Sequence, residues 1–329
     1  CLGLVQALRA EPVPISLDLD QLKKTIPTIT SDRYPDADDV LVDDYLHTKY
    51  QADGTSITYD DQAFKILTEK GRKANRTITL WFNQSYGSAK VLLAEIYKGD
   101  GKVVKVDVEK LSQVMVDRSQ MSSNIFDPNH KNWTTTIPDL EVGDTLRFVT
   151  CHETTKPRVP NTFSDYHTFE GTMPIVRYKI EIDAPKALPL KHHILKDEVE
   201  GTVAFSQKES GDRIVYQWIA QNVPQMFPEA DMPARYTVVQ RLLVSTIASW
   251  NDVSTWYWNL CLPRMKTTDA MKAKVDELTK GLTNRDEIIR AVFRFVSQEI
   301  RYMGITVEKE APGYEPHDVE LTFNNRHGV

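Results

Sequence analysis

Cysteine is scarce in this 329-residue sequence, which contains only three cysteines. Cys1, Cys151 and Cys261 stand far apart, so none of the closely paired spacings that zinc sites and disulfide frameworks require is present. We therefore expect no metal site and no disulfide-stabilised small fold. At this length, and with 41% apolar residues, the chain can bury a large core without such cross-links.

Concentrated positive charge and long apolar runs are also missing. The formal net charge is -6 and no block of lysine or arginine occurs, whereas phosphate binding needs a concentrated basic face. We therefore expect no nucleic-acid partner. No stretch approaches the ~18 uninterrupted apolar residues that span a bilayer, so we expect no transmembrane segment in the mature chain.

The common cofactor and hydrolase signatures do not occur either. The sequence has no G-x-x-x-x-G-K-[ST], no G-x-G-x-x-G, no H-E-x-x-H and no G-x-S-x-G. We expect no cofactor. Two sets of polar residues could be taken for metal ligands, namely the adjacent His192 and His193 and an acidic run. On a strand, adjacent histidines point to opposite faces, so we interpret them as surface residues. The acidic run lacks the spacing of a calcium loop and is interpreted as a solvated stretch: Asp38, Asp39, Asp43 and Asp44.

Aromatic residues gather near position 250. Trp250, Trp256, Tyr257 and Trp258 would suit a sugar-binding platform, but a helix face packed into an interface is the commoner reason for such a cluster. Three N-x-[ST] triplets, which begin at Asn75, Asn83 and Asn132, matter only if the host glycosylates its proteins.

The first ten residues resemble the end of a secretory signal. Residues 1–8, "CLGLVQAL", are apolar apart from Gln6, and the small Ala10 precedes the polar "EPVPIS". We interpret 1–10 as a signal-peptide remnant and expect an exported protein, and the family resemblance described below implies the periplasm or cell surface of a bacterium. A lipid anchor on Cys1 and an ordinary buried segment are the alternatives. After export, Cys151 and Cys261 would be structural thiols or a disulfide.

Residues 33–222 show the pattern of β-strands. In "VRYKIEID", Tyr178, Ile180 and Ile182 alternate with charged residues, and "KVVKVDV" at 102–108 alternates in the same way. Asp53-Gly54, Asp100-Gly101 and Gly211-Asp212 supply tight turns between such runs. Because no helical run long enough for parallel crossovers separates the strands, we expect an antiparallel β-sandwich or barrel of roughly 200 residues.

After Arg241 the apolar period becomes helical. The spacing predicts three amphipathic helices, over 249–260, 267–282 and 284–300, with Ser249 and Asn284 as N-caps. The predicted fold class is therefore α+β, with an N-terminal antiparallel sandwich followed by the helical first part of a second domain.

Five segments in order resemble a bacterial family that has a DUF3857 domain ahead of a transglutaminase-like, papain-like core. They are "RYPDADDVLVDDY", "IPDLEVGDTLRF", "RLLVSTIASWNDV", "IRYMGITVE" and "GYEPHDVELTFNNRHGV". The resemblance implies a DUF3857-like domain at 11–240 and an incomplete transglutaminase-like core at 241–329. It also implies that a cysteine nucleophile follows "NNRHGV" directly, with the histidine and aspartate of the triad further along.

The resemblance places seven residues on motif positions that would form the cleft beside the nucleophile, and it assigns none of them to catalysis. Glu315 stands where the family often has glutamine, which leaves the role of that position in doubt. The seven residues are Tyr302, Gly304, Tyr314, Pro316, His317, Arg326 and Gly328.

Two functions are compatible with these patterns. In the first, the parent protein is a cysteine-dependent protease, amidase or acyl transferase that acts on protein or peptide amides, and the present chain is inert without the nucleophile. In the second, the sandwich is a non-catalytic binding or scaffolding module at the cell surface. The sequence does not decide the oligomeric state.

Overall fold

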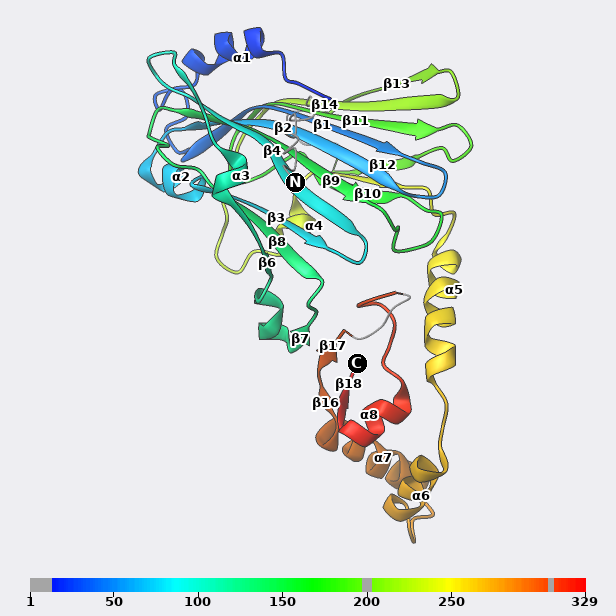
Figure 1. The fold of residues 1–329 in the computed structure, drawn as a ribbon. Helices are drawn as coiled ribbons and strands as arrows, with labels where there is room; N and C mark the ends of the chain where they lie inside the picture. The colour runs from blue at the N-terminus through cyan, green and yellow to red at the C-terminus, as the bar shows by residue number, and fades with distance from the viewer. Residues whose placement is uncertain (1–13, 197–202, 307–310) are drawn as a thin grey trace, which may run out of the picture. The chain divides into compact units, whose positions relative to one another are not determined.

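The computed structural model describes residues 14–196, 203–306 and 311–329. The chain forms two compact units (Figure 1). The first unit contains residues 1–80, 87–114 and 133–246, and the second contains 81–86, 115–132 and 247–329. The two domain limits given by the resemblance, 11–240 and 241–329, stay predictions. The strand-rich and helical parts together make a mixed α+β protein.

An eight-stranded sheet dominates the first unit (Figure 1). Its strands lie in the order β13-β14-β11-β1-β2-β9-β4-β5. In that order their bounds are Ala204–Ser210, Arg213–Val223, Ile175–Pro185, Asp39–Tyr50, Ser56–Ile66, Thr145–Thr154, Gly87–Tyr97 and Val103–Lys105.

Two three-stranded sheets accompany the large sheet. One has the order β10-β15-β12, over Ser164–Thr168, Arg241–Ser245 and Lys191–Leu195. The other has the order β3-β8-β6, over Thr77–Asn83, His130–Thr136 and Ser112–Val116. The helix α1 at Leu19–Thr25 precedes β1, and three short helices join strands: α2 at Glu69–Ala74, α3 at Val108–Leu111 and α4 at Arg235–Val238.

The expectation of purely antiparallel pairing was wrong at one place. β1 and β11 run parallel, with Leu41 beside Ile175 and Lys49 beside Asp183, while the other pairs of the large sheet are antiparallel. Parallel neighbours need a long connection. Here the chain supplies it by passing through β2 to β10 before β11 forms.

The hairpin turns are confirmed. Gly54 joins β1 to β2 at a φ of 84°, and Gly101 joins β4 to β5 at a φ of 87°. A Cβ atom at residue 54 would also lie 2.3 Å from the carbonyl oxygen of Thr162, so glycine is needed there for both conformation and space.

The strand expected over 102–108 is shorter than its alternation suggests. β5 ends at Lys105, and Val108 begins α3 instead. Asp107 caps this helix by accepting a hydrogen bond from the backbone N–H of Lys110. The same apolar cluster nevertheless includes or contacts all three valines, Val104, Val106 and Val108. The alternation therefore predicted correctly which side chains are buried, but it overestimated the length of the strand.

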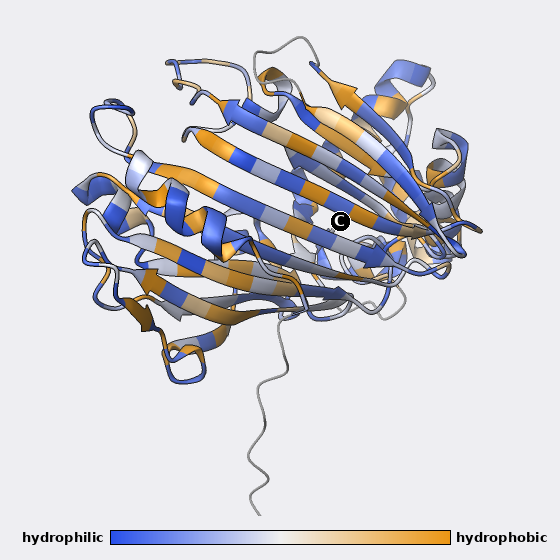
Figure 2. Ribbon diagram, turned by 90° about the horizontal axis from the view of Figure 1, so that it is seen from above, coloured by the Kyte–Doolittle hydropathy of each residue, from blue (hydrophilic) through white to orange (hydrophobic). Residues whose placement is uncertain are grey.

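Apolar side chains pack on both faces of the large sheet. On one face, Ile180 and Trp218 of the large sheet pack with Leu242 of β15, and Leu146 of β9 packs with Ile78 of β3. Part of the opposite face is covered by α1, where Leu22 belongs to the same apolar cluster as Val40 and Ala63. Figure 2 shows alternating hydrophilic and hydrophobic bands along the strands, as expected where one face of a strand is packed and the other face carries polar side chains.

The second unit contains the three expected helices. They are α5 at Trp250–Cys261, α6 at Asp269–Leu278 and α7 at Arg285–Glu299, followed by α8 at Val319–Asn325. Ser249 and Asp252 form a capping box at α5, and the Asn284 side chain accepts hydrogen bonds from the N–H groups of Asp286 and Glu287 at α7. α6 ends four residues before Leu282, which was expected to belong to its apolar stripe.

Short elements complete this unit. They are the 3-10 turns Ser119–Ser123 and Leu262–Arg264 and the two-residue strands β7 (Ile125–Phe126), β16 (Arg301–Tyr302), β17 (Gly304–Ile305) and β18 (His327–Gly328). β16 pairs with β18, and β17 pairs with β7, both in parallel. Among the helices that the structure describes, none combines the length and the apolar composition needed to cross a bilayer.

Limited proteolysis is expected to cut the helical segment after residue 245 before it cuts the large sheet. Apolar side chains of this segment are exposed, with Trp250 at 86%, Phe293 at 66% and Val296 at 51% of their full accessibility. Few buried contacts mean that local opening costs little free energy. Mass spectrometry of fragments from brief digestion would check this. Equal survival of both segments would contradict it.

Candidate functional site

A cavity of about 400 Å³ lies among the helices of the second unit. Most of its lining is apolar and comes from α6, α7 and α8. Val275 and Leu278 stand on α6, Val292 and Phe295 stand on α7, and Phe323 stands on α8. The helical spacing of these residues therefore predicted a shared apolar surface, and that surface forms the walls of a cavity.

Pro316 and His317 are the two members of the predicted cleft set that line this cavity. His317 is 8% exposed, and its Nε2 lies 3.0 Å from the carbonyl oxygen of Ile305. Its backbone N–H also donates to the carbonyl oxygen of Val329, at 3.3 Å. His317 therefore connects three segments of the second unit, which favours a positioning role over proton transfer.

Arg326 and Gly328 shape the turn from α8 to β18. Arg326 ends the helix in the left-handed conformation, with φ at 58°, and its guanidinium lies 4.8 Å from the ring centroids of both Phe295 and Phe323. A Cβ atom at residue 328 would lie 2.3 Å from the Oγ1 atom of Thr322. Glycine therefore allows the turn to pack tightly against α8, and Val329 then enters the cavity lining.

The other three predicted residues do not line the cavity. Tyr302 is 61% exposed on β16. Gly304 pairs with Ile125 in the two-residue sheet of β17 and β7. Tyr314 makes an edge contact with Tyr86, at 6.1 Å between ring centroids, and lies 5.8 Å from the ring of Trp256.

Glu315, whose role was in doubt, forms an ion pair with Arg264. The Glu315 side chain is 3% exposed, whereas the side chain of Arg264 is 36% exposed. The pair ties the end of α5 and its following turn to the segment that leads into α8. No local sequence pattern indicates this pair, because its members are 51 positions apart in the chain.

Cys261 also lines the cavity, but its position does not favour a nucleophile. It is the last residue of α5, at the opposite end from the helix N-terminus where an activated cysteine is expected. Its hydrogen bond with Tyr257 raises the pKa of the tyrosine hydroxyl. Cys151 is buried in β9 of the first unit. Neither cysteine is a catalytic candidate.

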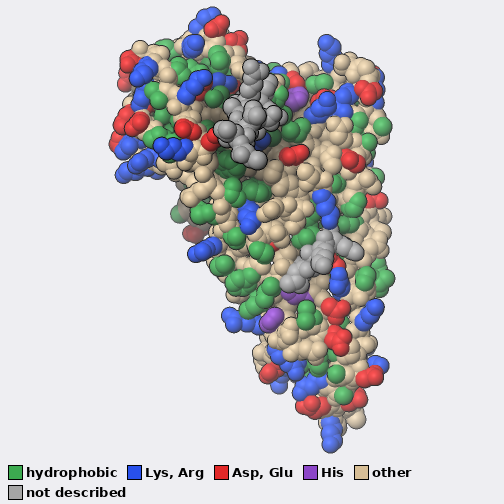
Figure 3. Space-filling view, viewed as in Figure 1, with side chains coloured by type: hydrophobic (Ala, Val, Ile, Leu, Met, Phe, Trp, Pro, Cys, Tyr) green, Lys and Arg blue, Asp and Glu red, His purple; other side chains and the backbone are tan. Residues whose placement is uncertain are grey.

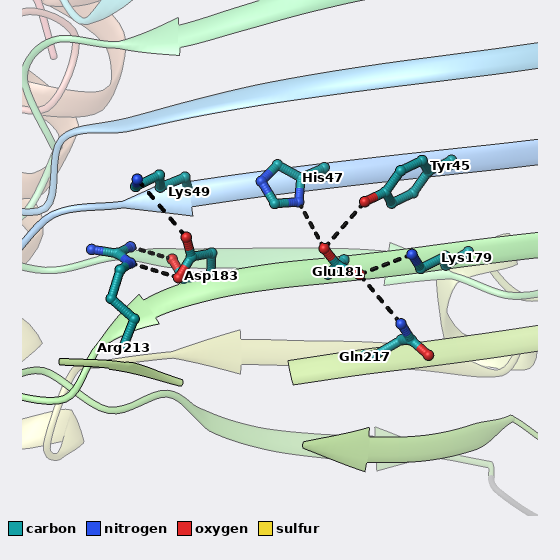
Figure 4. A network of polar contacts seen from close by, with 8 residues as sticks. All are labelled: Tyr45, His47, Lys49, Lys179, Glu181, Asp183, Arg213 and Gln217. Atoms are coloured by element: carbon teal, nitrogen blue, oxygen red, sulfur yellow. Dashed lines mark hydrogen bonds and ion pairs between the residues drawn. The ribbon is translucent and has the colours of Figure 1, made fainter. Parts of the chain in front are cut away.

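A polar network covers the open face of β1, β11 and β14 in the first unit (Figure 4). Glu181 lies at its centre. One carboxylate oxygen accepts from the Tyr45 hydroxyl at 3.1 Å and lies 3.2 Å from His47 Nδ1. The other lies 2.8 Å from Lys179 Nζ and accepts from Gln217 at 3.2 Å. These bonds, with His47 first, hold the pKa of Glu181 far below its usual value. The network is satisfied, so we interpret it as structural.

The interpretation of the acidic run as solvated was wrong for two of its members. Asp43 and Asp44 are only 6% and 3% exposed, because strand β1 lies in the middle of the sheet. Asp43 pairs with Arg177 at 2.8 Å, and Asp44 accepts from Gln62 at 2.9 Å. Asp38 and Asp39 pair with Lys70 and Asn75 instead.

Asp44 also interacts with Asp60 of β2, a residue that the sequence did not single out. Burial raises the pKa of Asp60 to about 6, with repulsion by Asp61 adding to the rise and a hydrogen bond from Asp44 opposing it. Burial and repulsion by Asp60 raise the pKa of Asp44 well above its usual value. A buried pair of interacting carboxyls of this kind is a functional-site signal that only the folded structure reveals.

Asp60→Asn is expected to stabilise the first unit at pH 8 by about 2 kcal/mol, or roughly 4–8 °C in Tm. The pKa of Asp60 is raised in the folded state, to about 6. Its contribution to stability is therefore fully present below pH ~4 and is lost as the pH rises through about 6. The variant and the parent should have similar stability at pH 4. Thermal melts at the two pH values check this, and a gain that is the same at both would contradict it.

His192 and His193 lie on β12 as expected, and both are exposed. No group of three or more metal-ligating side chains occurs within residues 14–196, 203–306 and 311–329. On the face seen in Figure 3, positive and negative side chains are interspersed, and no continuous basic area is visible among the residues drawn in colour.

Comparison with known proteins adds three findings. The family model for DUF3857, a domain of unknown function with a solved structure, matches residues 52–227. A crystal structure of a candidate protease from Parabacteroides distasonis superposes with a TM-score of 0.69 at 16% identity, over 89% of this chain. The chain spans 56% of the length of that protein. No curated protein matches the chain.

Other solved structures are much less similar. An M1 zinc metallopeptidase from Deinococcus radiodurans has a TM-score of 0.32 at 9% identity, over 63% of this chain and 42% of its own. Leukotriene A4 hydrolase from Saccharomyces cerevisiae has a TM-score of 0.31 at 11% identity, over 70% of this chain and 33% of its own. These two carry no argument. The likeness to the Parabacteroides protein extends the fold assignment over most of the chain, and the family match establishes that the chain belongs to the DUF3857 family.

Proposed function

We propose that this chain is the N-terminal portion of an exported bacterial protein with a transglutaminase-like core, which cleaves or transfers protein or peptide amides with a cysteine nucleophile. The observation that carries the proposal is the superposition on a protein described as a candidate protease, which extends over 89% of this chain but only 56% of the other. The remaining length of that protein leaves room for a catalytic segment.

The geometry of the second unit supports the same proposal. The α8–β18 turn holds Val329 at the cavity wall beside His317, and Gly328 is the residue that permits the close approach. In the proposed core, a cysteine that follows this turn would begin a helix. The positive end of the helix dipole would favour its thiolate.

The proposed reaction is acyl transfer. The thiolate attacks the amide carbonyl carbon, a histidine protonates the leaving amine, and a thioester remains on the sulfur. Water or a second amine then attacks the thioester and regenerates the thiol. Hydrolysis, deamidation and crosslinking differ only in the substrate amide and in the acceptor. Pro316, His317, Arg326 and Gly328 would shape the cleft, and none of them would transfer protons.

The alternative of a non-catalytic binding module has weaker support, because the solved structure that superposes over most of the chain is described as a candidate protease. The test is to produce the protein that the complete coding sequence specifies and to incubate it with casein and with an amine-bearing fluorophore. We expect cleavage or labelling that iodoacetamide abolishes. Activity that resists thiol alkylation, or no activity under any condition, would contradict the proposal.

A further inference from the structure

The first unit contains a cavity of about 430 Å³ at the end of the large sheet where β1 and β11 begin and β14 ends. Three segments line it, namely residues 33–37, 174–175 and 222–227. It shares no lining residue with the cavity beside His317. Its volume lies in the range of roughly 300–1,000 Å³ that small-molecule sites usually occupy.

The apolar part of the lining is rigid. Each of the three segments contributes one proline, and proline fixes the backbone φ angle: Pro35, Pro174 and Pro224. The Gln225 side chain donates a hydrogen bond to the backbone carbonyl oxygen of Asp36, at 3.1 Å, and so ties the first segment to the third. Walls that are already fixed lose little conformational entropy when a ligand binds.

Two aromatic rings also line the cavity. Tyr34 comes from the first segment, and Phe227 from the third. Phe227 is 62% exposed, so most of its ring is left uncovered by the protein. Together with the prolines, these rings offer a surface on which an apolar side chain of a ligand can pack.

Two side chains of opposite charge, Arg33 and Asp36, belong to the same lining. The Arg33 guanidinium lies 5.4 Å from the ring centroid of Tyr34 and 3.5 Å from the carbonyl oxygen of Thr28. Within the described part of the chain, Arg33 and Asp36 form no ion pair with each other or with another side chain. A positive and a negative group therefore both face one apolar cavity without neutralising each other.

This combination of charges discriminates between classes of ligand. A simple anion would be attracted by Arg33 but repelled by Asp36, and the reverse holds for a simple cation or a metal ion. A zwitterion can pair with both groups at once. The planar guanidinium suits a carboxylate, and the carboxylate of Asp36 can accept the N–H groups of an ammonium.

We propose that this cavity binds a small zwitterion with an apolar side chain, namely a free α-amino acid or a short peptide. Arg33 would bind the carboxylate of the ligand and Asp36 its ammonium group. The side chain would pack on Phe227 and the prolines. The inference concerns the first unit alone and does not depend on the proposed catalytic function.

The experiment uses residues 1–329 at pH 7.0 and constant ionic strength, with L-phenylalanine and the dipeptide alanyl-phenylalanine as probes. Backbone amide chemical shifts report both the place and the strength of binding. We expect saturable binding with a dissociation constant of roughly 1 mM, as befits a ligand of this size. The shifts should be confined to residues 33–37, 174–175 and 222–227. The tighter of the two probes identifies the length of the ligand.

Each charge of the ligand is tested by a probe that lacks it. L-Phenylalaninamide has no carboxylate and N-acetyl-L-phenylalanine has no ammonium, so each should bind at least fivefold more weakly than L-phenylalanine. Arg33→Met and Asp36→Asn should each weaken the binding of L-phenylalanine at least fivefold. Both positions are exposed, so neither variant should impair folding.

The matched controls are Arg76→Met and Asp212→Asn, which remove exposed charges outside the cavity and should bind as the parent does. The proposal is overturned if neither zwitterion binds saturably. It is also overturned if the amide or the N-acetyl derivative binds as tightly as L-phenylalanine, or if Arg33→Met or Asp36→Asn binds L-phenylalanine as tightly as the parent.

Discussion

Arg147→Met is expected to lower the free energy of unfolding of the first unit by about 3–5 kcal/mol. Arg147 is 4% exposed and Asp61 is fully buried beside it. The guanidinium donates to both Asp61 oxygens, at 2.9 and 2.6 Å, and to Glu95 at 3.0 Å. The bonds join β9 to β2 and β4. Methionine would keep the volume but leave two carboxylates without their cation.

Urea unfolding measures this loss, and Arg72→Met is the matched control. Arg72 pairs with Glu69 on the surface of α2, three residues away, and its loss should change stability little. Arg147→Met combined with Asp61→Leu should recover part of the loss, because the uncompensated charge is removed. If Arg147→Met and Arg72→Met were equally stable, the buried cluster would not hold the sheet together as described.

Arg264→Met is expected to destabilise the second unit by about 2–3 kcal/mol. The cost arises because Glu315, with a side chain 3% exposed, would lose its cation. The estimate lies below that for Arg147 because the Arg264 side chain is 36% exposed and is screened by water. The change should also loosen the segment that holds His317 and leads into α8.

Hydrogen exchange of residues 311–329 measures this effect directly. Arg264→Met should increase exchange there, and adding Glu315→Gln should restore part of the protection, because a neutral amide is cheaper to bury than a carboxylate. Lys272→Met is the control, since Lys272 pairs with Asp269 on the exposed surface of α6. Unchanged exchange in Arg264→Met would show that the ion pair does not hold this segment.

Much of the local structure was predictable from the sequence. The alternation around Tyr178 and Ile180 correctly predicts strand β11 and which of its faces is buried. The Asp-Gly turns correctly predict two hairpins of the large sheet. As N-caps, Ser249 and Asn284 correctly predict where α5 and α7 begin. These signals are local, since a turn or a cap depends on residues within one turn of the chain.

The parts that could not be predicted depend on distant pairing. The alternation of β1 does not say that β11 will lie beside it in parallel, because strand period carries no information about the neighbour. The burial of Asp44 follows from that central position and from Gln62 on the next strand. The Arg264–Glu315 pair and the Asp44–Asp60 pair each join residues from different elements, so no local sequence pattern predicts that they are in contact.

The most direct test of the proposed function is the coding sequence beyond the codon for Val329. A transglutaminase-like core predicts a cysteine codon directly after it, followed downstream by histidine and aspartate codons. Replacing that cysteine by serine should then abolish the amide chemistry of the complete protein. A coding sequence that continues without a cysteine at that position, or that stops there, would contradict the proposed function.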